Sequence, residues 1–263
     1  MRIWLQSAAS VGHDIKYKLY EESLKRNIRK VVREDTVVDV RGVKAFPFDM
    51  SPCYYFEHLN TSQILENGLQ AEKEGYDAFA INCSLEPGYY ELRQILDIPV
   101  FSVTATVLHV ACLLGDKFSV IAHIKEYKMR IEQLIKRYEL EEKSAGTGLF
   151  ATPAPVAGIA RDFENPKASA AVEAFISEAE KAVERGAEVV IPLDGVLNRL
   201  VLDAGITQVK GAPVLPTVEI FIKCVEMMVD LQQKAGVSIS RLLLYAQPGK
   251  ERLKEARKAY GVG

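Results

Sequence analysis

The chain has 263 residues, of which 48% are hydrophobic and 26% charged, and 33 Lys and Arg against 35 Asp and Glu give a formal net charge of −2. This composition excludes an intrinsically disordered chain, which would be poorer in apolar residues and more unbalanced in charge. The near-neutral charge also removes the simplest argument for a nucleic-acid partner. The length suits one large domain or two small ones, each able to bury a hydrophobic core.

The four cysteines are spread along the chain, and no two of them have the C-x-x-C spacing of a zinc site or a redox dithiol. They are Cys53, Cys83, Cys112 and Cys224. The first ten residues lack an apolar core of signal-peptide length, and the mainly apolar stretch 100–114 is shorter than the about 20 residues that span a bilayer. The sequence therefore predicts a cytoplasmic protein with reduced thiols, no metal site, and neither a membrane nor a nucleic acid as partner.

Short apolar runs alternate with longer amphipathic patterns through the first half of the chain. The short runs predict strands at 2–6, 36–43, 78–82 and 99–103, and the longer patterns predict helices at 16–32, 62–73, 91–96 and 106–114. The run 78–82 (AFAIN) is continuously apolar, which is typical of a strand buried on both faces of a parallel sheet.

The second half repeats this alternation. It predicts strands at 118–122, 156–159, 188–191 and 213–215, and helices at 125–137, 165–185, 198–204 and 218–233. The turn-rich segment 144–155 predicts a flexible crossing, and the basic tail from Gly249 predicts a solvated surface segment. The alternation of strands and helices indicates an α/β protein with parallel sheets that are covered by helices.

Two segments of nine residues mark an internal repeat. The segments 75–83 (GYDAFAINC) and 186–194 (GAEVVIPLD) each run from a glycine through an acidic residue and an apolar strand to a polar end. Each is followed by a short helix and then by an Ile/Ala-Pro-Val strand. The repeat predicts two similar α/β lobes, in which Cys83 and Asp194 occupy equivalent positions.

Cys83 and Asp194 each come directly after a predicted parallel strand. Ligands of parallel α/β sheets bind at the carboxyl ends of the strands, and a cleft between two lobes is a usual place for a small-molecule site. If the lobes face each other, the thiol and the carboxylate approach one substrate from opposite sides.

Further segments carry a family resemblance. They are Met1-Arg2-Ile3, 77–83 (DAFAINC), Pro87-Gly88, 97–100 (DIPV), Leu108-His109, Leu114-Gly115 with 118–120 (FSV), and 186–189 (GAEV). In order and spacing, over most of the chain from residue 1 to about Arg241, they resemble the Asp/Glu/hydantoin racemase superfamily. The hydantoin and allantoin racemase branch is the most similar.

The resemblance implies two pseudo-symmetric α/β lobes, a homo-oligomer, and proton transfer without a cofactor at a carbon next to a carbonyl. In that family two cysteines face each other across a small-molecule substrate. Cys83 matches the first of them, whereas the second position holds Asp194. This departure puts a symmetrical mechanism with two thiols in question.

A thiol and a carboxyl are not matched as acid and base. Their ordinary pKa values, about 8.5 and 3.9, correspond to roughly 6 kcal/mol between the two placements of the proton. Burial can raise the pKa of Asp194, and a helix amino end can lower that of Cys83. Both shifts are needed to bring the pKa values of the thiol and the carboxyl close together. The alternative is a one-way reaction in which Cys83 is nucleophile or proton donor and Asp194 is base or orienting group.

Other polar residues near strand ends are candidates for substrate binding. They are Ser7, Ser10, Ser84, His123, Gly195 and Thr217. Ser7 and Ser10 match polar positions of a substrate loop in the family, and His123 stands where the family often has Thr. His109, inside an apolar helix, is expected to be a core residue, and Tyr54 and Tyr55 are expected in a loop.

The sequence thus predicts a cofactor-independent racemase or isomerase acting on a small amino-acid derivative, hydantoin-like ring or dicarboxylate. The alternatives are a Cys83-dependent decarboxylase, lyase or cis-trans isomerase of the same superfamily, and a small-molecule binding protein without turnover. We expect a first lobe at 1–115 with the C-terminal helix packing on it, a second lobe at 116–240, and a tail at 241–263.

Overall fold

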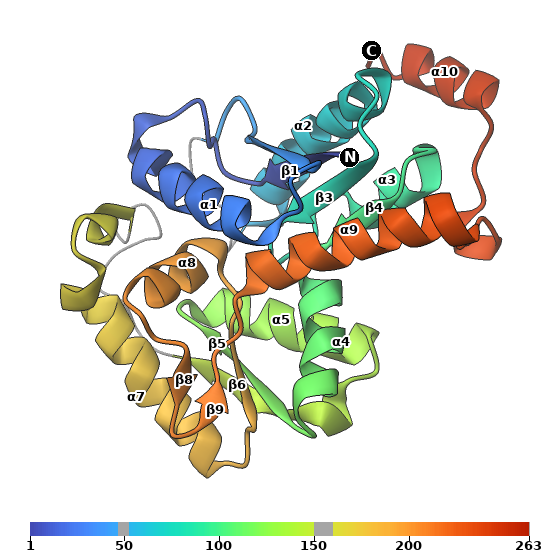
Figure 1. Cartoon of the computed structure of the whole chain (residues 1–263). Coiled ribbons are helices and arrows are strands. Elements are labelled where there is room, and N and C mark those ends of the chain that lie inside the picture. The colour runs from blue at the N-terminus through green and yellow to red at the C-terminus, as the bar shows by residue number, and fades with distance from the viewer. Residues whose placement is uncertain (47–52, 150–159, 263) are drawn as a thin grey trace.

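The computed structural model describes residues 1–46, 53–149 and 160–262, and it has two lobes that are each built around a parallel β-sheet (Figure 1). The first half of the chain forms one sheet and the second half forms the other. The predicted α/β class with two similar lobes is therefore confirmed. The lobe boundaries near residues 115 and 240 stay a prediction.

The first sheet has the order β2-β1-β3-β4, and its strands pair in parallel. The strands are β1 (Arg2–Ser7), β2 (Val37–Arg41), β3 (Ala78–Asn82) and β4 (Val100–Ser102). Leu5 of β1 lies opposite Val40 of β2 and Ala80 of β3, so β1 and β3 form the buried centre of the sheet. All five residues of β3 are buried, as the apolar run at 78–82 predicts.

The second sheet has the order β6-β5-β7, again with parallel strands. The strands are β5 (Phe118–Ala122), β6 (Ser144–Leu149) and β7 (Val189–Pro192). Val214 forms a further parallel bridge to Val190 on the far side of β7. With that bridge the second sheet repeats the strand order of the first, and β3 and β7 occupy equivalent central places. The internal repeat in the sequence is therefore a repeat in the fold.

Helices cover both sheets. They are α1 (Lys18–Val31), α2 (Tyr54–Lys73), α3 (Tyr89–Ile95), α4 (Val103–Leu114), α5 (Lys125–Arg137), α7 (Ala170–Glu184), α8 (Gly195–Asp203), α9 (Thr217–Ala235) and α10 (Lys250–Ala259). In the first sheet, Ile3 and Leu5 of β1 belong to one hydrophobic cluster, whereas Trp4 belongs to another. Successive strand residues point to opposite faces, so the sheet is buried on both sides.

One large hydrophobic cluster extends over both lobes. It contains Leu5 of the first sheet and Ile121 of the second, together with Leu108 of α4 and Phe221 of α9. Helix α9 follows the second sheet in sequence, yet it contacts α1, β3 and α4 (Figure 1). Because α4 and α9 pack against each other between the sheets, they join the lobes in a shared core.

Several predicted elements are wrong in extent or type. Helix α2 begins at Tyr54 rather than at 62, so Tyr54 and Tyr55 are helical and not in a loop. The start of the supposed crossing at 144–155 is strand β6, because pairing with β5 outweighs its glycine-rich composition. The predicted strand at 156–159 lies outside the described residues.

Two elements of the second half of the chain also differ from the prediction. The helix predicted from 165 begins at Ala170, after a short 3₁₀ turn at Pro166–Ala168, because the Ser169 hydroxyl accepts hydrogen bonds from two amides of its first turn. Residues 212–213 form β9 (Ala212–Pro213), which pairs antiparallel with β8 (Gln208–Val209). The predicted strand at 213–215 joins the parallel sheet through the bridge of Val214 to Val190 and the hydrogen bond from the Leu215 amide to the Val190 carbonyl.

The tail contains α10, which has no buried residue and is held to α2 through two hydrogen bonds of 2.8 Å between Arg257 and Glu66. Among the helices that the structure describes, none has both the length and the apolar character needed to cross a bilayer.

Candidate active site between the two sheets

A small pocket of about 70 Å³ lies where the carboxyl ends of β1 and β3 meet the start of α8. Its lining comes from both halves of the chain and consists of Ser7, Ala8, Ala9, Tyr17, Tyr20, Phe46, Asn82, Cys83, Ser84, Tyr127, Asp194, Gly195 and Val196. This volume is far smaller than that of a pocket for a drug-sized ligand, which takes about 300–1,000 Å³. The structure thus brings Cys83 and Asp194 to one cavity from two different sheets.

Cys83 lies in a turn directly after β3. The carbonyl of Cys83 accepts a hydrogen bond of 3.1 Å from the amide of Glu86, and Gly88 has a φ of +75° before α3 begins at Tyr89. The thiol is therefore separated from the nearest following helix by several residues. No helix amino end, which could lower the pKa of Cys83, follows it directly in this turn.

The environment instead raises the pKa of Cys83 to about 12. Although part of the residue is open to the pocket, the protein surrounds the sulfur densely, and this desolvation is the main cause. The negative charges of Glu57, Asp194 and Glu86 add to the effect, and the amide of Leu85 opposes it only in part. Cys83 is consequently a protonated thiol near neutral pH, which can give a proton but is a poor nucleophile.

The buried carboxyl group of Glu86 holds the turn that carries Cys83. Glu86 has a φ of +58°, and it accepts hydrogen bonds from the Ser102 hydroxyl, from the amide of Ala105 at 3.0 Å and from the Tyr138 hydroxyl at 2.6 Å. Burial raises the pKa of Glu86. By binding an amide in the first turn of α4 and a tyrosine that follows α5, Glu86 fixes the Cys83 turn to both lobes.

Asp194 lies directly after the second central strand and is the N-cap of α8. Its Oδ1 accepts a hydrogen bond of 2.9 Å from the amide of Leu197, and the residue is only 7% exposed. The positive end of the helix dipole favours a carboxylate here. Within the described residues the other oxygen of Asp194 has no hydrogen-bond partner, so it is free to accept a proton from a ligand in the pocket.

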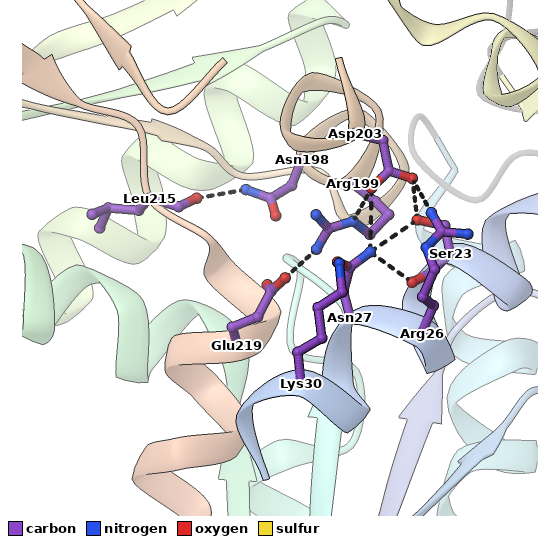
Figure 2. Close-up of polar contacts among 9 residues, drawn as sticks. All are labelled: Ser23, Arg26, Asn27, Lys30, Asn198, Arg199, Asp203, Leu215 and Glu219. Carbon is purple, nitrogen blue, oxygen red and sulfur yellow. Dashed lines mark hydrogen bonds and ion pairs between the residues drawn. The ribbon is translucent and has the colours of Figure 1, made fainter. Parts of the chain in front are cut away.

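A polar network holds the rest of α8 in place (Figure 2). The Arg199 side chain, 4% exposed, pairs with Glu219 of α9 and with Asp203 of its own helix. Asp203 in turn accepts hydrogen bonds from Ser23, from Arg26 at 2.9 Å and from Asn27 at 3.2 Å. Because these three residues belong to α1, the network ties the helix that Asp194 caps to a helix of the first lobe.

Comparison with known proteins agrees with this arrangement. A model of the family described as Asp/Glu/Hydantoin racemase matches residues 19–225. The chain belongs to the Asp/Glu/hydantoin racemase family. Hydantoin racemase from Pseudomonas sp. (strain NS671) is 28% identical over 233 residues, which cover 89% of this chain and 88% of that protein. The family recognised from sequence motifs is therefore confirmed.

Solved structures support the same fold. The allantoin racemase from Pseudomonas fluorescens superposes with a TM-score of 0.78 at 23% identity, covering 95% of this chain and 98% of that one. The allantoin racemase from Klebsiella pneumoniae gives a TM-score of 0.77 at 20% identity, covering 95% and 94%. At these identities the likeness establishes the shared two-lobed architecture, and membership of the family supports an isomerase of the racemase type.

Of the predicted binding residues of this family member, Ser7, Ser84 and Gly195 line the pocket with Cys83 and Asp194. Three others are buried near strand ends but are not part of its lining: Ser10, His123 and Thr217. The ring of His123 lies 5.9 Å from that of Tyr127, which does line the pocket. A substrate-binding role for these six residues stays a prediction.

Sequence reasoning missed the tyrosines of the pocket. Tyr20 of α1 is 3% exposed, and its hydroxyl accepts a hydrogen bond of 3.4 Å from Nδ2 of Asn82. Asn82, the last residue of β3, also lines the pocket. In an amphipathic helix Tyr20 resembles any core residue, so periodicity alone gives no signal for a polar role.

An ion pair links the lobes beside the pocket. Arg130 of α5 donates two hydrogen bonds, of 2.7 and 3.0 Å, to the carboxylate of Glu57 in α2, and the Tyr54 ring lies against its guanidinium. The charge of Glu57 contributes to the raised pKa of Cys83. Because the predicted helix begins only at residue 62, the sequence does not indicate this ion pair or the effect of Glu57 on the pKa of Cys83.

Other residues singled out from the sequence have no part in this pocket. Cys53, Cys112 and Cys224 are not part of the pocket lining, and all four cysteines are free thiols. His109 is exposed rather than in the core, with its ring against that of Tyr138, because it lies on the outer side of α4. In the part of the chain that the structure describes, no cluster of three or more His, Cys, Asp or Glu side chains is arranged to hold a metal ion.

Proposed function

We propose that the protein is a cofactor-independent racemase acting at a carbon next to a carbonyl of a small hydantoin-like ring or related amino-acid derivative. The observation that carries the proposal is the convergence of Cys83 and Asp194 on one pocket from equivalent ends of β3 and β7. The similarity to hydantoin racemases supports the choice of substrate class.

In this mechanism Asp194 and Cys83 act on opposite faces of the substrate. The free oxygen of Asp194 removes the proton from the carbon, and the electron pair of the C–H bond moves onto the neighbouring carbonyl oxygen to form an enolate. The Cys83 thiol then delivers its proton to the other face of the same carbon. The carbonyl forms again, and the product is the other enantiomer.

After one turnover the two groups hold their protons in the unfavourable arrangement, a thiolate and a carboxylic acid. The raised pKa of Cys83 makes that thiolate a strong base. The thiolate therefore regains a proton from water while Asp194 releases one, and both groups return to their starting states. The product consequently carries a hydrogen that came from solvent.

Isotope exchange tests this proposal. Single enantiomers of 5-substituted hydantoins and of allantoin are incubated with the protein in D2O, and optical rotation and proton NMR are followed together. We expect rotation to decay while one deuterium enters the recovered compound at the carbon next to the carbonyl. Unchanged rotation with no deuterium uptake across this panel would contradict the proposal.

A second candidate is a one-way reaction in which Cys83 only donates a proton, as in a decarboxylation. The raised pKa of Cys83 favours it, because a thiol that stays protonated suits protonation of an enolate better than proton removal. In that reaction the C–C bond to a carboxylate breaks, carbon dioxide leaves, and the electron pair is protonated by Cys83. Release of carbon dioxide from a 2-substituted malonate, without rotation decay in the hydantoin panel, would favour this candidate over the racemase.

A further inference from the structure

The hydroxyl of Tyr20 lies at the meeting point of the two loops that carry Cys83 and Asp194. It is 3.4 Å from Nδ2 of Asn82, the residue before Cys83. It would also lie 3.0 Å from a Cβ atom built on Gly195, the residue after Asp194. All of these residues line the pocket. Tyr20 therefore places a polar group between the two lobes, next to both proposed acid-base residues.

The hydrogen-bonding capacity of this hydroxyl is only partly used. A tyrosine hydroxyl has one hydrogen to donate and lone pairs that accept. The Asn82 amide donates to the Tyr20 oxygen, and none of the described residues accepts the hydroxyl hydrogen. A buried donor without an acceptor costs about 1–3 kcal/mol. A buried hydroxyl of this kind at a pocket wall indicates that a ligand oxygen completes the bond.

The surroundings keep the hydroxyl protonated. Burial and the negative charge of Asp194 both raise the pKa of Tyr20 above its ordinary value, and the opposing effects of Asn82 and Arg199 are smaller than the burial effect. Tyr20 is thus a permanent hydrogen-bond donor at neutral pH and not a second base.

We propose that the Tyr20 hydroxyl is a catalytic hydrogen-bond donor to the carbonyl oxygen next to the carbon that changes configuration. The inference rests on the proposed function. When Asp194 removes the proton, negative charge develops on this oxygen, and a donor fixed in a buried site stabilises that charge more than it stabilises the neutral carbonyl. Tyr20 keeps its own proton throughout, so the transfer between Asp194, the carbon and Cys83 stays balanced.

The absence of a side chain at position 195 fits this role. A methyl group there would meet the Tyr20 oxygen at 3.0 Å, closer than an ordinary contact, whereas it would meet Nδ2 of Asn82 at 3.9 Å. Gly195 has a helical φ that any residue adopts, since it is not among the positive-φ glycines. The glycine is therefore explained by the room that the Tyr20 hydroxyl needs and not by backbone conformation.

The first test is Tyr20→Phe, assayed by deuterium uptake and rotation decay with the racemised substrate. We expect kcat to fall about 10²–10³-fold with KM changed little, as is typical for loss of one oxyanion donor. Tyr76→Phe is the matched control, because it also removes the hydroxyl of a buried tyrosine but one bonded to Asp39, away from the pocket. We expect its kcat to stay within twofold.

The second test separates a catalytic role from a packing role. Gly195→Ala alone should lower kcat about tenfold by displacing the hydroxyl, but it should have little further effect in the Tyr20→Phe background, where the oxygen is gone. Independent packing effects would instead add. Thermal unfolding of each variant checks that the fold is kept.

The outcomes are distinguishable from failure of the proposed function. If Cys83→Ala and Asp194→Asn abolish exchange while Tyr20→Phe stays within threefold of the unchanged protein, the role of Tyr20 is overturned and the proposed function stands. If Cys83→Ala and Asp194→Asn both keep full exchange, or the unchanged protein has none, the proposed function fails and the role of Tyr20 falls with it.

Discussion

The ends of β3 and β7 occupy equivalent places in the repeated fold, yet they present their functional groups in different ways. After β7 the chain enters a helix at once, and Asp194 caps it through the amide of Leu197. After β3 a turn intervenes, so Cys83 has no helix amino end beside it, and its pKa rises to about 12. The helix amino end is therefore beside the carboxyl group of Asp194 and not beside the thiol of Cys83.

The sequence leaves open whether helix and burial effects bring the pKa values of the thiol and the carboxyl together, and this difference argues against it. Levelling would need a helix amino end that lowers the pKa of Cys83, but the structure places such an end at Asp194 instead. The ordinary gap between thiol and carboxyl, worth roughly 6 kcal/mol, is widened on the thiol side. In the proposed mechanism, this difference makes Cys83 the proton donor and Asp194 the base in the direction that starts from thiol and carboxylate.

A substitution at the thiol tests the difference between the two strand ends most directly. Cys83→Ala removes the proton donor, and we expect racemisation to fall about 10⁴-fold, at the upper end for loss of a general acid. Cys224→Ala serves as control, because that thiol lies on α9 outside the pocket lining. Steady-state polarimetry measures both, and retention of a tenth of the activity by Cys83→Ala would contradict a donor role.

Two substitutions of Asp194 separate its proposed role as a base from its role as the N-cap of α8. Asp194→Asn removes the base but keeps a good N-cap, so we expect activity to fall about 10³-fold with stability unchanged. Asp194→Ala loses both, and its free energy of unfolding should fall by a further about 0.5–2 kcal/mol. Urea denaturation compares the two variants. Equal stability of both would show that the bond to Leu197 has no capping role.

The arrangement also predicts how slowly Cys83 reacts. At pH 8 a thiol with a pKa of about 12 has roughly 10³-fold less thiolate than one with a pKa of 9, and its greater intrinsic nucleophilicity recovers only part of this. We expect exchange with hydroxyethyl disulfide to be at least roughly 30-fold slower than for free cysteine. The sign of the pH dependence follows. Because the folded-state pKa is raised, the rate should keep increasing up to about pH 11, where free cysteine has levelled off. A plateau below pH 10 would contradict it.

The network around Arg199 gives a further test, since it holds α8, the helix that Asp194 caps, against α1 and α9. Arg199→Met leaves Asp203 and Glu219 without their buried cation, and we expect the free energy of unfolding to fall by about 3 kcal/mol. Arg26→Met is the control, because Arg26 bonds the same Asp203 but is 56% exposed, so its loss should cost less than about 1 kcal/mol. Equal losses would show that burial of Arg199 has no special weight.

Much of the fold could be predicted because strong local patterns coincide with the buried centre. The strands at 78–82 and 118–122 and the helix at 125–137 have the predicted bounds. The start of α2 could not be predicted in this way, since contacts such as Glu57 with Arg130 join elements far apart in sequence. Likewise, β6 owes its strand to pairing with β5 and not to its Gly-rich composition.

The candidate site was predictable where the repeat marked it. Cys83 and Asp194 follow strands with a recognisable shared pattern, and both line one pocket. Tyr20 could not be found, because its place in the site depends on how α1 packs against the loops at Asn82 and Gly195. Pro87-Gly88 indicates a turn after β3, but the contacts of the buried Glu86 carboxyl could not be predicted, because they join elements far apart in sequence.

The hydrogen bond that joins Asp194 to the amide of Leu197 has a further consequence for timing and selectivity. A carboxylate already confined to one rotamer loses little conformational entropy when a substrate arrives, a saving of about 0.5–1 kcal/mol in the activation barrier. The same hydrogen bond also prevents the carboxylate from changing its position to reach a carbon that is bound in the wrong place. A fixed carboxylate should therefore favour rigid cyclic substrates, because the C–H bond of a ring has a fixed direction. An open-chain compound must first adopt the conformation that places its C–H bond next to the carboxylate.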